Sequence, residues 1–264
     1  MTPLAEAPAD RLRRVRVVVT DMDDTLTHQG RLSARTYRAL ERLRDAGVAV
    51  VPVTAAPAGW CDQMARMWPV ASVIAENGGL HIRPTGPGTV AHDFWHGDDA
   101  RDAAAARLAA LAGRIRDRIP QARPATDQPF RLTSLAYDRP EDPGVRAALL
   151  EAFRAAGARV TVNSLWVLGW FGDYDKLAMI RRALAGAHGL DIDAAGEAVL
   201  SVGDSTNDAP MFAFFANSVG VSTVTRFLAE IPTPPAWITR GPGGEGFVEV
   251  ADALLTARTT GDHP

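Results

Sequence analysis

The sequence predicts an α/β fold, in which a Rossmann-like, doubly wound parallel sheet forms the core and an α+β domain is inserted into it. Three observations lead to this prediction. Short Val-rich strand patterns alternate with amphipathic helix patterns at both ends of the 264-residue chain. The middle of the chain breaks this alternation with adjacent strand patterns of its own. Polar residues follow directly after several strand patterns, where open α/β sheets bind their ligands.

Residues 15–95 are expected to form the first part of the core. Their short, continuous apolar runs are typical of strands that are buried on both faces of a parallel sheet. Ser33 can cap a helix and Gly47 can end it. The predicted elements are the strand Val15–Thr20, the helix from Ser33 to Gly47, the strand Val48–Thr54, the helix Ala58–Met67, the strand Ser72–Ala75 and a hairpin of Leu80–Arg83 with Val90–Asp93.

Residues 96–171 are expected to form the inserted domain. Asp142, Pro143 and Gly157 are the residue types preferred before, at the start of and just after a helix. The predicted elements are the helix Asp99–Ile119, the strand Phe130–Tyr137, the helix between Asp142 and Gly157, and the strands Ala158–Asn163 and Leu165–Phe171.

Residues 172–264 return to the alternating pattern and are expected to complete the core. Met1–Arg14 is polar and is expected to be a frayed tail, without the apolar run of a secretory signal. The predicted elements after residue 172 are the helix Tyr174–His188, the strand Ala198–Val202, the helix Ala209–Ala216, the strand Ser218–Val221, the helix Val224–Ile231, the strand Ala236–Thr239 and the helix Phe247–Ala257.

The composition limits the possible partners and the location. A net charge of -3 gives no basic surplus for binding nucleic acid or anionic lipid, so we expect neither a nucleic-acid nor a membrane partner. Cys61 is the single cysteine, which excludes an internal disulfide and fits the reducing cytoplasm. We therefore expect a cytoplasmic protein, as a monomer or a homodimer.

Acidic residues are concentrated after two of the predicted strands. Asp21 and Asp23 follow the first strand, although acids are depleted in strands and repel one another. Asp204 and Asp208 follow the strand Ala198–Val202. Because the carboxyl ends of parallel strands share one edge of the sheet, we expect these four carboxylates to converge. Carboxylates bind hard cations, most simply Mg²⁺.

Two further residues are expected at the same edge of the sheet. Thr54 ends the second strand, and Lys176 opens the helix that follows the inserted domain. A lysine, a bound metal ion and helix N-terminal N–H groups can together neutralise a phosphoryl group. The residues therefore point to phosphoryl chemistry with a carboxylate as nucleophile or proton carrier.

These residues resemble those of a known family. The segments that resemble, in order and spacing, the four motifs of haloacid dehalogenase-like phosphohydrolases are Asp21–Leu26, Thr54, Lys176 and Gly203–Asp208. The insert is similar to the large α+β cap of the subgroup that holds Cof-like, sucrose-phosphate and mannosyl-3-phosphoglycerate phosphatases. The segments Glu76–Gly79 and Gly246–Val248 resemble that subgroup as well.

The resemblance implies a Mg²⁺-dependent phosphomonoester hydrolase that works through an aspartyl-phosphate. It implies that Asp21 is the nucleophile, that Asp23 is the general acid and base, and that Thr54 and Lys176 hold the phosphoryl oxygens. The implied metal ligands are Asp21, Asp23 through its backbone carbonyl, Asp204 and Asp208. The implied phosphate- and substrate-binding residues are Thr25, which braces the loop, Thr54, Asn77, Lys176 and Asn207.

The second motif departs from the subgroup in one respect. The subgroup continues from its Ser or Thr into Gly-Arg, whereas Thr54 is followed by Ala55-Ala56-Pro57. The phosphate-binding hydroxyl is kept, but a cation near the substrate is missing. We therefore expect different contacts to the leaving group.

The inserted domain is expected to act as a lid, with hinges near His96–Asp98 and Gly169–Asp173. The candidate specificity residues on its strands are Arg131, Asn163, Ser164 and Trp166, with packed or solvated strand residues as the alternative interpretation. A lid of this size favours a small phosphorylated metabolite as substrate, and a sugar phosphate or a glycosyl-phosphoglycerate is the leading choice.

Three other functions fit parts of the pattern. A sugar phosphomutase uses the same aspartyl-phosphate but returns the phosphoryl group to a sugar. A receiver-type signalling module also combines acids, a Thr and a Lys around Mg²⁺, but it is about half this length and has no insert. A catalytically inactive binding protein is the third possibility, although every motif acid is present.

Overall fold

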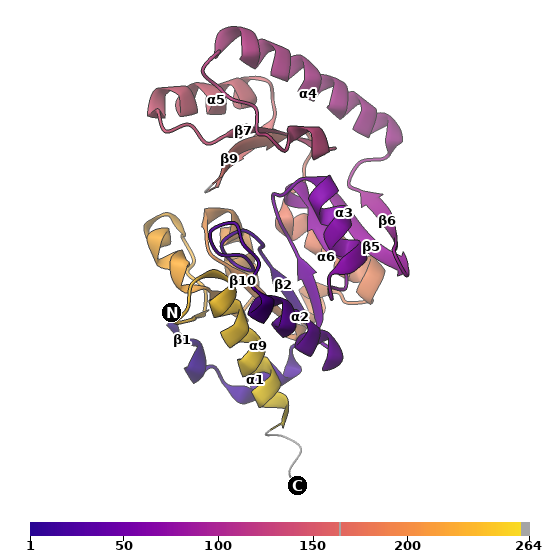
Figure 1. Cartoon of the computed structure of the whole chain (residues 1–264), viewed down its shortest axis with the longest axis vertical. Helices are drawn as coiled ribbons and strands as arrows, with labels where there is room; N and C mark the ends of the chain where they lie inside the picture. The colour runs from indigo at the N-terminus through magenta and orange to yellow at the C-terminus, as the bar shows by residue number, and fades with distance from the viewer. Residues whose placement is uncertain (164, 260–264) are drawn as a thin grey trace.

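The computed structural model describes residues 1–163 and 165–259, and it contains a parallel core sheet with a separate α+β cap above it (Figure 1). This confirms the predicted fold class. The six-stranded core sheet has the order β1-β12-β11-β10-β2-β3, and its strands are parallel. Its strands are β1 (Thr2–Pro3), β2 (Val17–Thr20), β3 (Ala49–Pro52), β10 (Val199–Gly203), β11 (Ser218–Gly220) and β12 (Trp237–Ile238).

Helices cover both faces of the core sheet. The α-helices of the core are α1 (Ala9–Arg14), α2 (Ala34–Asp45), α3 (Ala58–Met67), α6 (Lys176–His188), α7 (Ile192–Ala195), α8 (Ala209–Phe214) and α9 (Gly243–Thr259). The 3₁₀ turns of the core are η1 (Leu4–Glu6), η2 (Glu76–Gly78), η4 (Gly196–Ala198), η5 (Thr206–Asp208), η6 (Ser222–Arg226) and η7 (Leu228–Glu230).

The central strands are apolar on both sides because each side meets helices. In β2, Val18 packs into the cluster that contains Leu40 of α2 and Phe247 of α9. Its neighbours Val17 and Val19 point the other way, into the cluster formed with α6 and α8. Successive side chains of a strand alternate between faces, so a strand covered on both sides reads as a continuous apolar run.

The third predicted core strand is placed differently from the prediction. β4 (Val73–Ala75) pairs antiparallel with β5 (Leu80–Gly86), which pairs with β6 (Thr89–Phe94), and the three form a sheet of their own. A single parallel bridge between Val53 and Ile74 connects this sheet to the core strands. The turn η2 reverses the chain directly after β4, so β5 becomes its hydrogen-bonding neighbour.

The cap has a three-stranded antiparallel sheet of order β7-β9-β8, covered by two helices (Figure 1). Asp142 caps its second helix by accepting hydrogen bonds from the backbone N–H groups of Gly144 and Val145, and Gly157 is left-handed just after that helix, as predicted. The cap elements are α4 (Asp98–Arg118), η3 (Gln128–Phe130), β7 (Ser134–Asp138), α5 (Pro143–Ala155), β8 (Arg159–Val162) and β9 (Trp166–Trp170).

Three predicted elements need correction. Met1–Arg14 is not a frayed tail, because it forms β1 and α1 and buries Leu4 and Leu12 against the core. The segment 224–231 does not form an α-helix but part of η6 and η7, where the Thr225 hydroxyl hydrogen-bonds back to the Ser222 carbonyl. The strand predicted from Phe130 begins later, at Ser134, because a proline-containing 3₁₀ turn precedes it.

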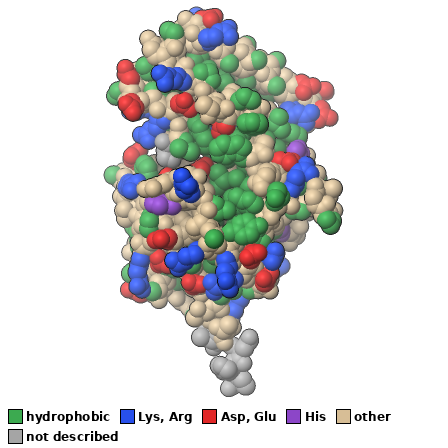
Figure 2. All heavy atoms as spheres, viewed as in Figure 1, with side chains coloured by type: hydrophobic (Ala, Val, Ile, Leu, Met, Phe, Trp, Pro, Cys, Tyr) green, Lys and Arg blue, Asp and Glu red, His purple; other side chains and the backbone are tan. Residues whose placement is uncertain are grey.

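The cap and the core meet along a partly apolar seam. Figure 2 shows hydrophobic side chains that continue from the cap onto the core on the face in view. Phe130 of the cap lies over Gly59 of α3, and Trp60, Phe130 and Leu132 are among the exposed large apolar side chains. Among the described residues, no helix is long and apolar enough to span a membrane.

Candidate active site

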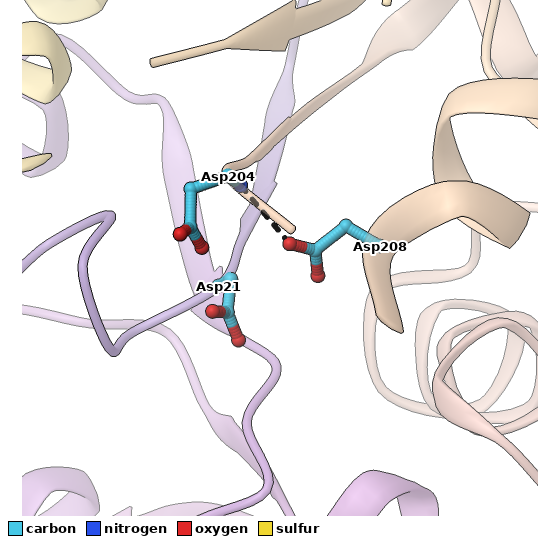
Figure 3. A group of neighbouring side chains, drawn as sticks. All are labelled: Asp21, Asp204 and Asp208. Atoms are coloured by element: carbon cyan, nitrogen blue, oxygen red, sulfur yellow. Dashed lines mark hydrogen bonds between the residues drawn. The ribbon is translucent and has the colours of Figure 1, made fainter. Parts of the chain in front are cut away.

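Three carboxylates converge at the carboxyl ends of β2 and β10 (Figure 3). Asp21 follows β2, Asp204 follows β10, and Asp208 ends the turn η5 just before α8. One oxygen from each carboxylate lies within 4.8 Å of the other two, and all three residues are buried. Carboxylates so close together repel one another unless a cation lies between or beside them.

The fold explains this convergence. β2 and β10 are parallel neighbours, and the Asp21 N–H donates to the Val202 carbonyl at 2.9 Å, so Asp21 and Asp204 leave the sheet side by side. Asp208 is held by the backbone N–H groups of Asp204 and Ser205, at 3.0 and 3.3 Å from its Oδ2. A Cβ on Gly203 would lie 2.5 Å from that oxygen, so only glycine allows this approach.

Lys176 provides the positive charge that faces the acids. Its Nζ lies 2.6 Å from Asp21 Oδ1 and 2.8 Å from Asp208 Oδ1, and the side chain is buried. Lys176 is the first residue of α6, which Asp175 caps by accepting from the Ala178 N–H at 2.8 Å. Burial opposes the lysine charge, but Asp208 and Asp21 outweigh it and raise the pKa of Lys176 above its ordinary value.

The carboxylates remain under-compensated despite Lys176. Burial, together with repulsion from Asp208 and Asp23, raises the pKa of Asp21 to about 8 against the attraction of Lys176. Burial and repulsion from Asp21 and Asp208 raise the pKa of Asp204 to about 9. A divalent cation would lower the pKa of these groups, and an all-oxygen donor set fits a hard ion such as Mg²⁺. The residues present therefore fit the expected metal.

Asp23 occupies a different position from the three converging acids. Its carboxylate is not part of that group. This is compatible with the resemblance, which implies that Asp23 binds the metal through its backbone carbonyl. It is half-buried, and burial raises its pKa to about 6. Arg131 and Asp127 of the cap are among the charges that act on it, so Asp23 lies on the side of the site that faces the cap.

The remaining predicted core residues lie around the acids. The Thr25 hydroxyl donates to Asp204 Oδ1 at 3.3 Å, which supports its expected bracing of the loop. Thr54 is buried, and its Oγ1 accepts from the Ala56 N–H at 3.0 Å. The Asn207 side-chain oxygen accepts from the Ser205 hydroxyl at 2.6 Å.

A cavity of about 450 Å³ opens between the site and the cap. Its core lining includes Asn77, Lys176 and Asn207. Its cap lining comprises Arg154, Ala158, Arg159, Val160, Thr161 and Trp170. A leaving group bound at Lys176 would therefore extend toward two arginines and a threonine.

The predicted cap residues do not line this cavity. Asn163 accepts hydrogen bonds from the N–H groups of Leu165 and Trp166 in the turn between β8 and β9. The Trp166 ring packs against Arg131, whose Cζ lies 4.8 Å from the ring centroid. Ser164 lies outside the described residues. The expectation that these side chains read the substrate is therefore not supported for Asn163 and Trp166, because the cap sheet uses them for its own turn and packing.

Arg131 is likewise engaged within the protein. It is buried, forms two hydrogen bonds with Asp127 at 3.2 and 3.0 Å, and donates to the Ala55 carbonyl at 2.8 Å. The cap thus places a guanidinium beside the segment where the subgroup carries its own arginine.

Sequence reasoning missed Arg154, Arg159 and Thr161 as cavity-lining residues. The predicted strand Ala158–Asn163 places residues 159, 161 and 163 on one face, so its alternation could have indicated two of them, although only the last was chosen. Arg154 lies on α5 and becomes part of the cavity only through the way the cap is seated.

Comparisons with known proteins identify related proteins. The family of haloacid dehalogenase-like hydrolases matches residues 18–95. A phosphoglycolate phosphatase from Pyrobaculum neutrophilum is 31% identical over 249 residues, which are 91% of this chain and 96% of that protein. The crystal structure of protein 0175 from Thermoplasma acidophilum has a TM-score of 0.71 at 18% identity, covering 91% of this chain and 98% of that one. A sucrose-phosphatase from Synechocystis has a TM-score of 0.63 at 16% identity, covering 92% and 98%.

The chain thus combines a parallel α/β core, a group of acids and a lysine at the carboxyl edge of the sheet, and a cap above them. The chain belongs to the haloacid dehalogenase-like hydrolases. The relative from Pyrobaculum neutrophilum that shows this membership is a phosphatase.

Proposed function

We propose that this protein is a Mg²⁺-dependent phosphomonoesterase that acts through an aspartyl-phosphate on a small phosphorylated metabolite. The observation that carries the proposal is the convergence of Asp21, Asp204 and Asp208 within 4.8 Å, with Lys176 bonded to two of them. Among the described residues this is the single group of three or more potential metal-binding acids, histidines or cysteines.

Each residue has a role in this proposal. Asp21 attacks the phosphorus and forms the acyl phosphate, while Asp23 protonates the departing alcohol and then takes a proton from the attacking water. Lys176 and Thr54 hold the phosphoryl oxygens. Asp21, Asp204 and Asp208 would hold Mg²⁺, which when bound supplies positive charge against the phosphoryl oxygens and lowers the repulsion between the acids.

The cavity supports a proposal for the leaving group. Arg154 brings positive charge to its cap side, while Arg159 is already paired there with Asp173 and Asp175. Arginine matches carboxylates and phosphates geometrically. A small phosphorylated carboxylic acid satisfies this charge, and the relative from Pyrobaculum neutrophilum is a phosphoglycolate phosphatase. We therefore rank phosphoglycolate and glycosyl-phosphoglycerates ahead of the phosphates of uncharged sugars.

A sugar phosphate is the second candidate. Thr161, Asn77 and Asn207 line the same cavity and can exchange hydrogen bonds with hydroxyl groups. The likeness in fold to a sucrose-phosphatase is compatible with this choice but shows the fold alone.

A phosphate-release assay tests both the activity and the ranking. Purified protein is incubated with Mg²⁺ or with EDTA and with phosphoglycolate, 3-phosphoglycerate, glucose 6-phosphate, a nucleoside monophosphate or a phosphopeptide. We expect Mg²⁺-dependent release of phosphate, fastest from a carboxylated substrate. Isomerised sugar phosphate without free phosphate would indicate a mutase instead, and a long-lived phosphoprotein would indicate a receiver-type module.

The location and assembly remain predictions. We propose a cytoplasmic enzyme that is a monomer or a homodimer and that binds neither nucleic acid nor membranes. Cell fractionation and light scattering on the purified protein would test these points.

A further inference from the structure

The turn η2 (Glu76–Gly78) has an unusual backbone. Glu76, Asn77 and Gly78 have φ angles of 49°, 57° and 104°, so three consecutive residues adopt left-handed conformations. Glu76 carries a side chain that rarely adopts this region, which asparagine and glycine adopt more readily. Such a backbone persists only where its surroundings hold it in place, and it is concentrated at functional sites.

Glu76 holds the turn by joining the cap to the core. Its Oε1 accepts from the backbone N–H of Ala58 at 3.0 Å and of Leu132 at 2.8 Å. Its Oε2 accepts from the N–H and hydroxyl of Thr133, at 2.9 and 3.0 Å, and from the Ser134 hydroxyl at 2.6 Å. One donor belongs to the first residue of α3, and four belong to the cap. The fully buried carboxylate is thus held by five donors.

The same turn touches the catalytic segments. The N–H of Asn77 donates to the carbonyl of Thr54, and the N–H of Glu76 donates to that of Ala56. A Cβ on Gly78 would lie 2.4 Å from the Asp175 carbonyl, directly before Lys176. The turn is therefore packed between the second motif and the start of α6.

Asn77 places an amide at the cavity without an internal partner. Its side chain is 3% exposed, it lines the cavity together with Lys176, and neither its Oδ1 nor its Nδ2 has a hydrogen-bond partner among the described residues. A buried amide without a partner is costly, so a polar ligand is the natural complement of this side chain. The left-handed backbone keeps the amide at the cavity.

We propose that Glu76 is a positioning residue that couples the seating of the cap to substrate recognition, because it holds Asn77 where the amide contacts the leaving group of the bound substrate. The proposal rests on the phosphomonoesterase function proposed above. Asn77 donates through Nδ2 and accepts through Oδ1, which suits a carboxylate or a hydroxyl on the leaving group. Glu76 does not itself touch the substrate.

The first experiment removes the amide without changing the backbone. Asn77→Gly keeps the left-handed conformation, and Asn77→Asp keeps the shape but replaces the donor with an anionic oxygen. Phosphoglycolate is compared with p-nitrophenyl phosphate, whose leaving group has neither a carboxylate nor a hydroxyl. We expect the KM for phosphoglycolate to rise about tenfold in Asn77→Gly and further in Asn77→Asp, with a clearly smaller rise in the KM for p-nitrophenyl phosphate. Equal changes for both substrates, or none, would overturn the proposal.

The second experiment tests the coupling through Glu76. Glu76→Gln replaces one carboxylate oxygen by an NH₂ group, which cannot accept hydrogen bonds from the surrounding N–H and O–H donors. Thr133→Val is the milder variant, because it removes only the Thr133 hydroxyl that donates to Glu76. We expect faster amide exchange at residues 132 and 133 and a selective rise in the KM for phosphoglycolate. The double variant Glu76→Gln/Asn77→Gly should have the KM of Asn77→Gly alone. If amide exchange became faster but the KM changes of the two single variants multiplied in the double variant, Glu76 would have a structural role only.

A binding measurement separates this proposal from the proposed function. The ¹⁵N side-chain signal of Asn77, assigned by its loss in Asn77→Asp, is followed during titration with phosphoglycolate. A shift in the wild type that is reduced in Glu76→Gln supports the coupling even if no phosphate is released. Absence of a shift with phosphoglycolate would refute it even if the enzyme is active.

Discussion

The core and the cap each bury charged side chains, but they balance them differently. In the core, Asp21, Asp204 and Asp208 face a single lysine, and the pKa values of Asp21 and Asp204 rise to about 8 and about 9. In the cap, Arg131 and Asp127 form a one-to-one pair with two hydrogen bonds and side-chain exposures of 0% and 5%. Several buried like charges that share one opposite charge mark a place where a ligand supplies the missing charge, whereas a balanced pair marks a structural contact.

The largest expected effect tests the unbalanced cluster. Asp21→Asn should lower the rate of phosphate release by about 10⁴-fold or more, because an amide is a poor nucleophile. The fold should persist, since the substitution keeps the shape and removes one of the repelling charges. Phosphate release with Mg²⁺ and thermal unfolding measure the two effects, and a variant with wild-type turnover would contradict the proposed mechanism.

The next effect concerns Asp23, which lies outside the cluster and faces the cap. Asp23→Asn should slow turnover by roughly 10²- to 10⁴-fold, the usual contribution of general acid–base catalysis. Substrates with very acidic leaving groups need little protonation, so the loss should be smaller for p-nitrophenyl phosphate than for phosphoglycolate. An equal loss for both substrates would assign Asp23 to another role.

The third effect tests the balanced pair of the cap. Arg131→Met leaves Asp127 buried without its cation, so the free energy of unfolding should fall by about 3–5 kcal/mol. The double variant Arg131→Met/Asp127→Leu should recover most of this loss. Urea unfolding measures both changes.

The exposed pair Arg181–Asp193, with side-chain exposures of 43% and 54%, is the matched control for Arg131. Arg181→Met should change the free energy of unfolding by less than about 1 kcal/mol, because solvent screens an exposed pair. If the two arginines had the same effect on stability, the distinction drawn between buried and exposed pairs in this protein would fail.

The sequence was sufficient for the core acids because their convergence depends on few variables. Parallel strands end at one edge, so the positions of Asp21, Asp204, Asp208 and Lys176 follow from the strand pattern and the connection order. The strand assignments needed only continuous apolar runs. The fold class and this group of charges were therefore predictable.

The seating of the cap was not predictable in the same way. Glu76 accepts hydrogen bonds from Leu132, Thr133 and Ser134, which are 56 to 58 residues away in the sequence. No local sequence pattern predicts a contact between residues so far apart. The cap strands were found, but the side chains that face the cavity depend on how the whole domain is oriented. For this reason the sequence did not indicate that Arg131 is bound to Asp127 and the Ala55 carbonyl.

A further effect, smaller than that expected for Arg131→Met, concerns His81, a buried ionisable residue of the core that stays neutral. Burial lowers its pKa to about 4 from the ordinary value of 6.5, and its Nε2 has no hydrogen-bond partner among the described residues. His81 binds a proton below pH 6.5 in the unfolded chain but only below about pH 4 in the folded protein. The neutral His81 therefore causes no loss of stability above pH 6.5, and the free energy of unfolding falls as the pH decreases from 6.5 toward 4.

His81→Gln removes this titration and isolates its share of the pH dependence. Between about pH 7.5 and about pH 5, the wild type should lose roughly 2 kcal/mol more stability than the variant, since one pH unit on one proton corresponds to about 1.4 kcal/mol. Urea unfolding at both pH values gives the difference, and subtracting the variant cancels the titration of the other groups. Parallel pH profiles would show that His81 can take up a proton in the folded protein. The core would then tolerate a charge at that position as readily as the cap tolerates Arg131, and the contrast between unbalanced and balanced buried groups would apply only to the carboxylates.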